Sequence, residues 1–383
     1  MKHKIVRITT VPISLEKLLS GQLRFMNSFY QIIAVSADKD KLEKLGKSQG
    51  IGVFSLEMTR KITPLQDVIA VLKLFLYLKK TKPFIVHSHT PKAGVVGMFA
   101  AKLAGVPNRL HTVAGLPLLE TTGSKRKLLN FVEKLTYNFA TKVYPNSFGL
   151  EQIIIENEFC KKEKLKVLAN GSSNGIDTSF FNPELFSLEQ NLSLKDRLKI
   201  HSQDFVFIFV GRLVKDKGIN EMVVAFEQLH KENNAVKLIL VGDYENDLDP
   251  LLPQTIKTIQ NHNSIISVGF QNDVRPYLAI ADILVFPSYR EGFPNVVMQA
   301  GAMGLASIVS NINGCNEIIK EGVNGFIIPV KNEEAIYLAM KKTISDTVMC
   351  ENIKQNSRPM IVSQYEQSVV WQAILEEYQS LEK

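Results

Sequence analysis

Short runs of apolar residues alternate along the chain with longer segments that have the spacing of amphipathic helices. The apolar runs lack polar alternation, which is typical of strands buried on both faces of a parallel sheet. In the first part of the chain we predict helices over 64–80, 91–104 and 125–140. The predicted strands of this part cover residues 5–9, 31–36, 52–55, 84–87, 109–113 and 142–145. This order predicts βαβ units and therefore an α/β domain with a doubly wound sheet.

The pattern begins again after a loose stretch, residues 172–202, that is rich in Ser, Asn and Asp. Here the predicted strands cover residues 205–210, 237–241, 264–268, 283–286, 306–310 and 325–329. The two arrays predict two Rossmann-like domains, 1–175 and 176–360, that face each other across a cleft. A chain of 383 residues is long enough for both. Residues 361–383 have apolar side chains at helical spacing and predict a closing helix that packs back toward the first domain.

Charge is distributed unevenly between the two predicted domains. The formal net charge is +7, but residues 1–175 carry +15 and residues 176–383 carry −8. A basic domain indicates an anionic partner such as nucleic acid, an anionic membrane surface or a phosphorylated substrate, unless surface charge has simply drifted. We expect no nucleic acid, because the chain has no recognisable nucleic-acid-binding module and no basic stripe with interleaved aromatic residues.

The sequence lacks the signals of a secreted or membrane-spanning protein. Its cysteines, Cys160, Cys315 and Cys350, are too few and too scattered for a disulfide framework or a zinc site, which fits a reducing cytoplasm. The apolar run near the N-terminus is too short for a signal peptide. The longest apolar stretch, 67–78, is too short to span a bilayer and predicts a core-facing helix. Any contact with a membrane is therefore expected to be peripheral.

Two loops in the second domain carry the residues of an anion site. Its first strand runs into a glycine-rich loop with Arg212 and Lys217, a planar guanidinium and a point charge that together suit a diphosphate. Its fourth strand runs into a loop with Glu291 and with Pro294, which is well placed near a helix start. The amides after Pro294 would point at an anion, so the Glu291 carboxylate must face a hydroxyl or a cation.

Six motifs follow one another in the second domain. They are Val210-Gly-Arg-Leu-Val-Lys-Asp-Lys-Gly218, Val268-Gly-Phe270, Ala281-Asp-Ile283, Pro287-Ser-Tyr-Arg-Glu-Gly-Phe-Pro-Asn295, Gly314-Cys-Asn-Glu-Ile318 and Gly322-Val-Asn-Gly325. This ordered set resembles the donor-binding half of GT-B glycosyltransferases of the "glycosyl transferases group 1" (GT4) family. The resemblance implies a nucleotide-diphosphate sugar bound by Gly211, Arg212, Lys217, Phe270, Glu291, Phe293, Pro294, Asn295, Val296 and Gln299. The catalytic candidates are Glu291, Arg212, Lys217 and, from the first domain, His111.

One residue departs from the family pattern. Glu291 matches the first acid of the family's Glu-x7-Glu motif, which implies a contact with the donor sugar, but the second position is Gln299. In the family the second acid holds the ribose hydroxyls. Glutamine keeps an acceptor oxygen and adds donors, so we expect ribose binding to survive. The departure motivates one alternative, a noncatalytic nucleotide-sugar-binding protein, and a UDP-sugar epimerase of the same architecture is a second.

The first domain carries a cluster of histidines near two predicted strand ends. The runs that begin at His87 and His111, together with Lys142-Val-Tyr-Pro-Asn-Ser147, resemble the acceptor-side domain of transferases for capsule, O-antigen or polyprenyl-diphosphate-linked oligosaccharides. Many relatives have a second His where this chain has Ala114, and a Gly-Gly loop where this chain has residues 12–22. Residue 114 therefore has no catalytic role. The acceptor-side candidates are His87, His89, Lys92 and His111.

The resemblance implies a retaining transfer without metal or other cofactor. The donor would be a UDP-hexose or a UDP-N-acetylhexosamine, and the acceptor a polyprenyl-diphosphate-linked glycan. Such an acceptor would hold the enzyme peripherally on the inner face of the cell membrane, with the anionic membrane surface as partner of the basic domain. We expect docking through the cluster 125–127 and the apolar residues after it, unless this is an ordinary solvated helix start. The pairs Asp38/Asp40 and Asp247/Asp249 resemble a metal-binding Asp-x-Asp motif, but we interpret them as solvated acids.

Overall fold

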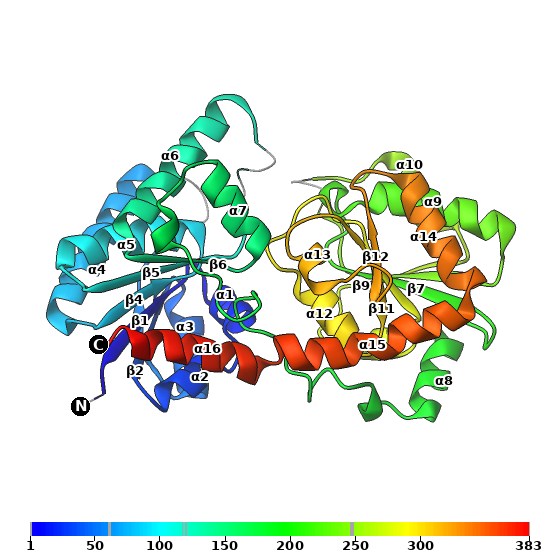
Figure 1. The fold of residues 1–383 in the computed structure, drawn as a ribbon, viewed down its shortest axis with the longest axis horizontal. Coiled ribbons are helices and arrows are strands. Elements are labelled where there is room, and N and C mark those ends of the chain that lie inside the picture. The colour runs from blue at the N-terminus through cyan, green and yellow to red at the C-terminus, as the bar shows by residue number, and fades with distance from the viewer. Residues whose placement is uncertain (1, 60–62, 117, 119–120, 246–248, 383) are drawn as a thin grey trace. The chain divides into compact units, whose positions relative to one another are not determined.

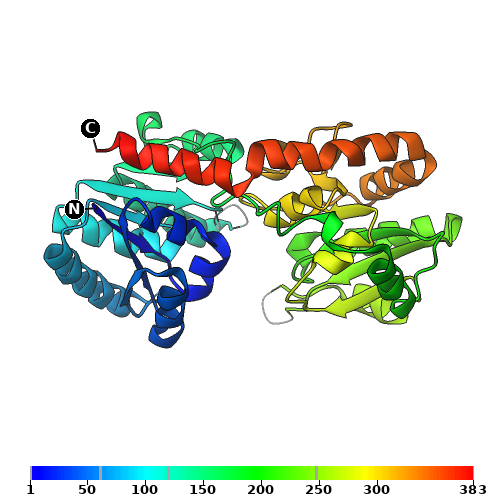
Figure 2. The same cartoon turned by 90° about the horizontal axis from the view of Figure 1, so that it is seen from below.

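The computed structural model describes residues 2–59, 63–116, 118, 121–245 and 249–382. The chain forms two compact units, one made of residues 1–175 and 368–383 and the other of residues 176–367 (Figure 1). Each unit has a parallel six-stranded sheet, and Figures 1 and 2 show helices on both faces of each sheet. The fold class predicted from the sequence, α/β with two doubly wound sheets, is confirmed.

Each of the predicted strands is present, with ends that differ by at most one residue. The first sheet has the order β3-β2-β1-β4-β5-β6, and the second has the order β12-β11-β10-β7-β8-β9. The strands are β1 (Lys4–Ile8), β2 (Gln31–Ser36), β3 (Gly52–Ser55), β4 (Ile85–Ser88), β5 (Asn108–Val113), β6 (Lys142–Pro145), β7 (Phe205–Val210), β8 (Val236–Val241), β9 (Ile265–Gly269), β10 (Ile283–Phe286), β11 (Ala306–Ser310) and β12 (Gly325–Ile328).

The helices of the first unit form two layers. They are α1 (Pro12–Leu18), α2 (Gln22–Asn27), α3 (Lys39–Gln49), α4 (Pro64–Thr81), α5 (Pro91–Ala104), α6 (Gly123–Phe139), α7 (Phe148–Glu156) and α16 (Gln367–Ser380). Successive side chains of a strand point to opposite faces, so Ile5 packs against α1, α2, α3 and α16, while Val6 packs against α4 and α5. Figure 1 shows α4, α5 and α6 above this sheet and α2 and α16 below it.

Two sequence interpretations of the first unit are corrected. Residues 12–22, which we treated as a loop, form α1 and the start of α2. Helix α4, predicted as a core-facing helix, buries only a stripe that includes Leu74 and Leu78 and leaves Leu72 and Leu76 exposed. A helix at the outside of a layer has one face to bury, so the opposite apolar face remains without a partner among the described residues.

The second unit is closed by α15 rather than by a single terminal helix. Its helices are α8 (Leu188–Arg197), α9 (Ile219–Glu232), α10 (Pro253–Asn261), α11 (Arg275–Ala279), α12 (Asn295–Ala302), α13 (Cys315–Ile318), α14 (Glu333–Ser345) and α15 (Thr347–Tyr365). Helix α15 ends at Tyr365 and α16 begins at Gln367. The second unit extends to residue 367 instead of 360, and the tail belongs to the first unit from Ser368 on. The amide of Gln367 still donates to the carbonyl of Ile176, 3.1 Å away.

The order of each sheet reverses at one pair of strands. In the first unit the reversal lies between β1 and β4, and in the second between β7 and β10. The crossover helices leave in opposite directions there, so the loops after these strands border a crevice at the carboxyl edge of the sheet. Of the candidate residues, Arg212 and Lys217 follow β7, Glu291 follows β10, and His89 and Lys92 follow β4.

Candidate active site

The loop after β7 brings a lysine to the reversal point of the second sheet. Gly211 directly follows the strand, and residues 215–217 form a single 3-10 turn that places Lys217 beside Phe286 of β10. Gly218 follows with φ +70°, and a Cβ there would lie 2.2 Å from the carbonyl oxygen of Pro287. The two loops can approach so closely only because this residue is glycine.

The loop after β10 supplies the carboxylate that Lys217 meets. The Nζ atom of Lys217 contacts Oε1 of Glu291, and the hydroxyl of Ser288 donates to the same oxygen over 2.9 Å. Both charged side chains are largely buried, with 15% and 17% of their surface exposed. Asn313 holds this loop in place, because its Nδ2 donates to the carbonyl oxygens of Glu291 and Gly292. The sequence had not revealed Asn313, although it directly precedes the Gly314 motif.

Arg212 and Lys217, which we expect to bind one diphosphate, have different side-chain partners. Arg212 is half exposed and forms an ion pair with Glu245, which follows β8. Phe270, after β9, exposes 65% of its side chain, and its amide donates to Asp243 over 3.0 Å. An exposed aromatic ring at this edge of the sheet can stack on a base.

Helix α12 begins directly after the Glu291 loop. Pro294 occupies its N-cap position, and no side chain caps the amides that follow, so those of Asn295 and Val296 are available to an anion. Gln299, half-buried on the next turn, makes no side-chain hydrogen bond to any described residue. The side chain of Phe293 packs instead in the core, with its ring centroid 5.4 Å from that of Tyr365.

The histidine cluster of the first unit is divided by the sheet. His87 and His89 lie on the face that α16 covers, whereas His111 and Lys92 belong to the other side, near α4, α5 and α6. Lys92 forms an ion pair with Asp67 of α4, with 2.5 Å between Nζ and Oδ2. The Nδ1 atom of His111 and the hydroxyl oxygen of Ser88 share a hydrogen bond of 2.8 Å, in which the tautomer of the ring decides the donor.

All three histidines are buried, and this determines their charge. Removal from water disfavours the imidazolium ion, which lowers the pKa of His111 to about 4 and the pKa of His87 and His89 well below the usual 6.5. The neutral ring of His87 bridges two hydroxyls, those of Tyr378 at 2.6 Å and Thr112 at 2.8 Å. A neutral imidazole offers its partners one donor nitrogen and one acceptor nitrogen.

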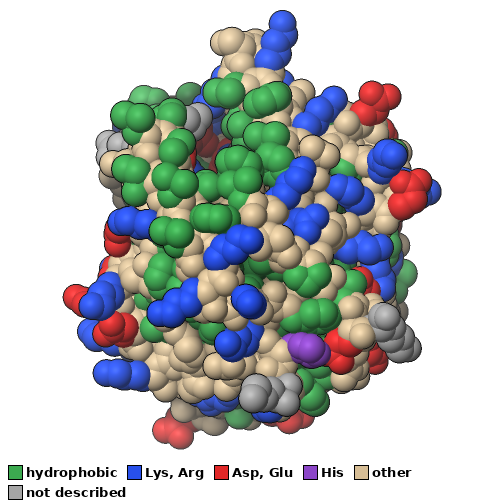
Figure 3. All heavy atoms as spheres, turned by 90° about the vertical axis from the view of Figure 1, so that its left-hand side faces the viewer, with side chains coloured by type: hydrophobic (Ala, Val, Ile, Leu, Met, Phe, Trp, Pro, Cys, Tyr) green, Lys and Arg blue, Asp and Glu red, His purple; other side chains and the backbone are tan. Residues whose placement is uncertain are grey.

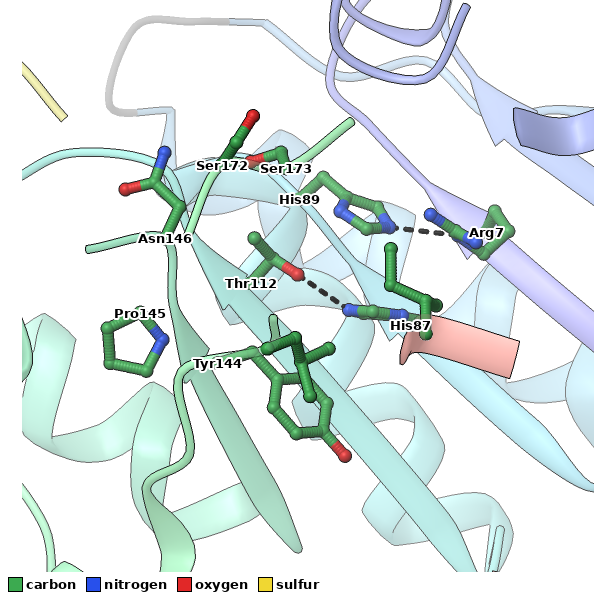
Figure 4. Close-up of a pocket in the computed structure, with 11 residues that line it drawn as sticks. Arg7, His87, His89, Thr112, Tyr144, Pro145, Asn146, Ser172 and Ser173 are labelled. Carbon is green, nitrogen blue, oxygen red and sulfur yellow. Dashed lines mark hydrogen bonds between the residues drawn. The ribbon is translucent and has the colours of Figure 1, made fainter. Parts of the chain in front are cut away.

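Arg7, the penultimate residue of β1, is a site residue that sequence analysis missed. Its side chain is fully buried, with Nε donating to Nε2 of His89 over 2.9 Å and Nη2 donating to Gln22 over 2.6 Å. The signal was present in the sequence, because a charged residue interrupts an otherwise apolar strand. Arg7, His87 and His89 line one narrow pocket of the first unit (Figure 4).

The described residues contain neither a metal site nor a membrane span. No group of three or more His, Cys, Asp or Glu side chains within them is arranged to hold a metal ion. Asp38 caps α3 and pairs with Lys41, Asp249 accepts from the amide of Asp216, and Asp247 lies outside the described residues. No helix of the described part of the chain is long and apolar enough to cross a bilayer.

Comparison with known proteins places both units among sugar transferases. Residues 191–360 match the family model "Glycosyl transferases group 1", and residues 30–171 match "Glycosyl transferase 4-like domain". The chain is 32% identical to the capsular polysaccharide biosynthesis glycosyltransferase CapM of Staphylococcus aureus, over 100% of this chain and 98% of that protein. It is 30% identical to an Escherichia coli UDP-Gal:alpha-D-GlcNAc-diphosphoundecaprenol alpha-1,3-galactosyltransferase, with 95% and 94% covered.

A solved structure shows the same architecture. HepE of Anabaena, crystallised in complex with UDP, superimposes with a TM-score of 0.82 at 22% identity, covering 99% of this chain and 100% of HepE. The fold of two six-stranded parallel sheets is thus the GT-B fold.

Proposed function

Because this chain belongs to the glycosyl transferases group 1 family, we propose that it transfers a sugar from a UDP-sugar to a polyprenyl-diphosphate-linked glycan during synthesis of a cell-surface polysaccharide. The donor is a UDP-hexose or a UDP-N-acetylhexosamine. Support comes from the E. coli relative, which is named for a UDP-Gal donor and a diphosphoundecaprenol-linked acceptor. The observation that carries the proposal is the buried pair of Lys217 and Glu291 at the reversal point of the second sheet.

In this proposal the diphosphate of the donor replaces Glu291 as the partner of Lys217. Arg212 and the uncapped amides of α12 contribute further positive potential. Glu291, released from Lys217, then accepts a hydrogen bond from a hydroxyl of the donor sugar, while Gln299 reaches the ribose. These groups stabilise the charge that develops on the departing diphosphate, so the transfer needs no metal ion.

We propose that the transfer retains the anomeric configuration. The acceptor hydroxyl attacks the anomeric carbon on the face from which the UDP diphosphate departs, and its proton passes to that leaving group. UDP-hexoses are α-linked, and the E. coli relative is named for the alpha-1,3 bond that it forms. Neutral His111 is suited to orient a substrate hydroxyl, because its pKa of about 4 keeps it uncharged in neutral solution.

The test is a donor screen with the purified chain and a short polyprenyl-diphosphate-linked GlcNAc acceptor. We expect transfer from one UDP-hexose or UDP-N-acetylhexosamine and none from GDP- or dTDP-sugars. EDTA should leave the rate unchanged, and NMR of the product should show an α linkage. Glu291→Ala should lower kcat/KM by at least about tenfold through loss of a charged hydrogen bond. UDP-sugar binding without transfer would instead indicate a noncatalytic protein, and an altered sugar without acceptor would indicate an epimerase.

A basic and apolar surface of the first unit supports docking on an anionic membrane. The outward side chains of α4 include Leu65, Val68, Ile69, Leu72 and Leu76, and α5 and α6 add Phe99, Leu103, Leu128 and Phe131, all of which are exposed. We call these residues the apolar face. Figure 3 shows hydrophobic side chains gathered on this side of the unit with Lys and Arg side chains beside them. Such a combination suits a bilayer with anionic lipids, because apolar insertion and charge attraction add.

The predicted basic cluster contributes only part of this surface. Lys125 and Lys127 are exposed at the start of α6, beside the apolar face. Arg126 is half-buried instead, and its guanidinium donates to the carbonyl of Leu118 over 2.6 Å and to Asn130 over 3.0 Å. We therefore assign membrane attraction to the two lysines and a structural role to the arginine.

A further inference from the structure

The pocket around Arg7 contains a buried positive charge that no carboxylate of the described residues neutralises. Arg7 is fully buried, and among the described residues its partners are Gln22, His89 and the ring face of Tyr378, whose centroid lies 5.9 Å from the guanidinium carbon. Burial lowers the pKa of Arg7, but a guanidinium keeps its proton in proteins. An unpaired buried charge is unfavourable, and an anion in contact with it would offset that cost.

Hydrogen-bonding groups without partners converge on the same pocket. The buried atoms that have no partner include Nη1 of Arg7, Nδ1 of His89, Oδ1 of Asn146 and Oγ of Ser173, and all four residues line it. Arg7 Nε can only donate, so Nε2 of His89 accepts, and the proton of the neutral ring is on Nδ1. Two of the orphaned atoms are thus fixed donors. In Figure 4 the ring of His89 lies between Arg7 and the pair Ser172 and Ser173.

The neighbouring serine adds another potential donor. The oxygen of Ser172 already accepts from the amide of Gly175 over 3.0 Å, so its own proton is available to a ligand. The amide of Asn146 can present its NH2 group to a ligand by a half-turn of the side chain. Donors around a positive charge are the arrangement that binds an oxyanion.

The size of the pocket limits what enters it. The free volume inside the pocket, measured for the centre of a water molecule, is about 10 Å³. This space holds one oxygen atom but not a whole phosphate. The pocket lies at the carboxyl edge of the first sheet, next to the reversal between β1 and β4, where ligands of such sheets bind.

We propose that this pocket receives one anionic phosphoryl oxygen of the lipid-linked acceptor, with Arg7 and His89 as its donors. The identity of the ligand as an acceptor diphosphate rests on the proposed function, because a free phosphate or the donor diphosphate would present the same oxygen. The rest of the diphosphate lies at the mouth of the pocket, beside Ser172 and Ser173. Arg7 is therefore an acceptor-binding residue for the transfer.

The test measures binding of three probes to the full chain by calorimetry: a short-chain prenyl diphosphate, UDP and inorganic phosphate. Arg7→Gln should weaken prenyl diphosphate binding by at least about tenfold, since charged hydrogen bonds contribute about 1.5–3 kcal/mol, and should leave UDP binding unchanged. Lys217→Gln should do the reverse. If both variants weaken only the binding of UDP, the pocket serves the donor and the proposal is wrong. If inorganic phosphate binds as tightly as the prenyl diphosphate, the pocket does not select a lipid-linked ligand and that part of the proposal is wrong.

Asn146→Asp provides a second variant in case Arg7→Gln does not fold. It places a carboxylate on the pocket wall, which should raise the melting temperature of the unliganded chain and weaken prenyl diphosphate binding. Unchanged prenyl diphosphate binding in Arg7→Gln or Asn146→Asp would mean that the pocket holds only water and would overturn the inference. A wild-type chain that binds the prenyl diphosphate, but neither binds UDP nor transfers sugar, would refute the proposed function and leave the pocket assignment standing.

Discussion

The Nζ atom of Lys217, from the loop after β7, contacts the Oε1 atom of Glu291, from the loop after β10. The ion pair joins the two loops at the reversal point of the sheet, and it occupies the position that we assign to the donor diphosphate. Lys217→Gln should therefore weaken UDP binding about 10- to 100-fold, as expected for a charged hydrogen bond. Lys215, exposed in the same 3-10 turn, gives the matched control, and calorimetry should find equal UDP affinity for Lys215→Gln and wild type. Equal losses in the two variants would point to general electrostatics instead.

Gln299 should contribute to donor binding without a negative charge. Its side chain has no hydrogen-bond partner among the described residues, so it is available to the ribose. Gln299→Ala should raise the Kd for UDP about fivefold, which corresponds to one neutral hydrogen bond. Gln299→Glu restores the acid of the family motif and should bind UDP within about threefold of wild type. An unchanged Kd in the alanine variant would remove Gln299 from the site.

Gly218 should be far less tolerant of a side chain than a glycine of similar conformation. Gly218 and Gly322 have φ of +70° and +69°, but a Cβ on Gly322 meets nothing within 4 Å, whereas one on Gly218 would clash with Pro287. Gly322→Ala should cost about 1–2 kcal/mol of unfolding free energy from backbone strain alone. Gly218→Ala should cost about 1–3 kcal/mol more and lower turnover, because the two loops must separate. Urea unfolding with an activity assay measures both effects, and equal costs would contradict the close approach.

The buried histidines should make the first unit sensitive to acid. The pKa of His111 is lowered to about 4 by burial, so between pH 6.5 and pH 4 the unfolded chain binds a proton that the folded chain does not. Folding stability should therefore fall as the pH falls through this window, by about 3 kcal/mol at pH 4 from His111. Urea unfolding of His111→Gln should show a shallower dependence on pH than wild type. Parallel curves would show that the ring titrates normally in the folded chain.

The apolar face should determine binding to vesicles. Leu72→Glu with Leu76→Glu places two charges on the exposed side of α4 and should reduce sedimentation with vesicles that contain anionic lipid by at least about tenfold. Leu188 and Leu192 of α8 are also exposed, at the same spacing in the second unit, so their replacement by Glu is the control and should have no effect. Lys125→Glu with Lys127→Glu should weaken binding mainly at low salt. Equal binding by the α4 variant would exclude this face.

The fold was predictable from the sequence because buried parallel strands have a strong local signature. Runs such as Phe205–Val210 are apolar on both faces, and their boundaries were correct to one residue. Pairings between distant side chains have no such signature. The ion pair of Arg212 with Glu245 was not predictable, and neither was the separation of His111 from His87. His111 is paired with Ser88 in the sheet, and neighbouring strand residues such as His87 and Ser88 point to opposite faces.

Arg7 shows what pattern analysis can miss and also where it can improve. We treated the first strand as an apolar run, although burial of an arginine in it creates an electrostatic requirement that only tertiary structure reveals. A charged residue inside an unbroken apolar strand is thus a signal in itself, because such a position is stable only with specific partners.

The position of α16 determines the order in which the two units can mature on the ribosome. Val370, Ile374 and Tyr378 belong to the core of the first unit, yet the whole second unit is translated before them. At about 5 to 20 residues per second, the first 175 residues wait roughly 10 to 40 s for the helix that covers His87. Until then the apolar side chains of the first unit that α16 covers lack this partner. The second unit has no residue beyond 367, so its core can be completed before that of the first unit.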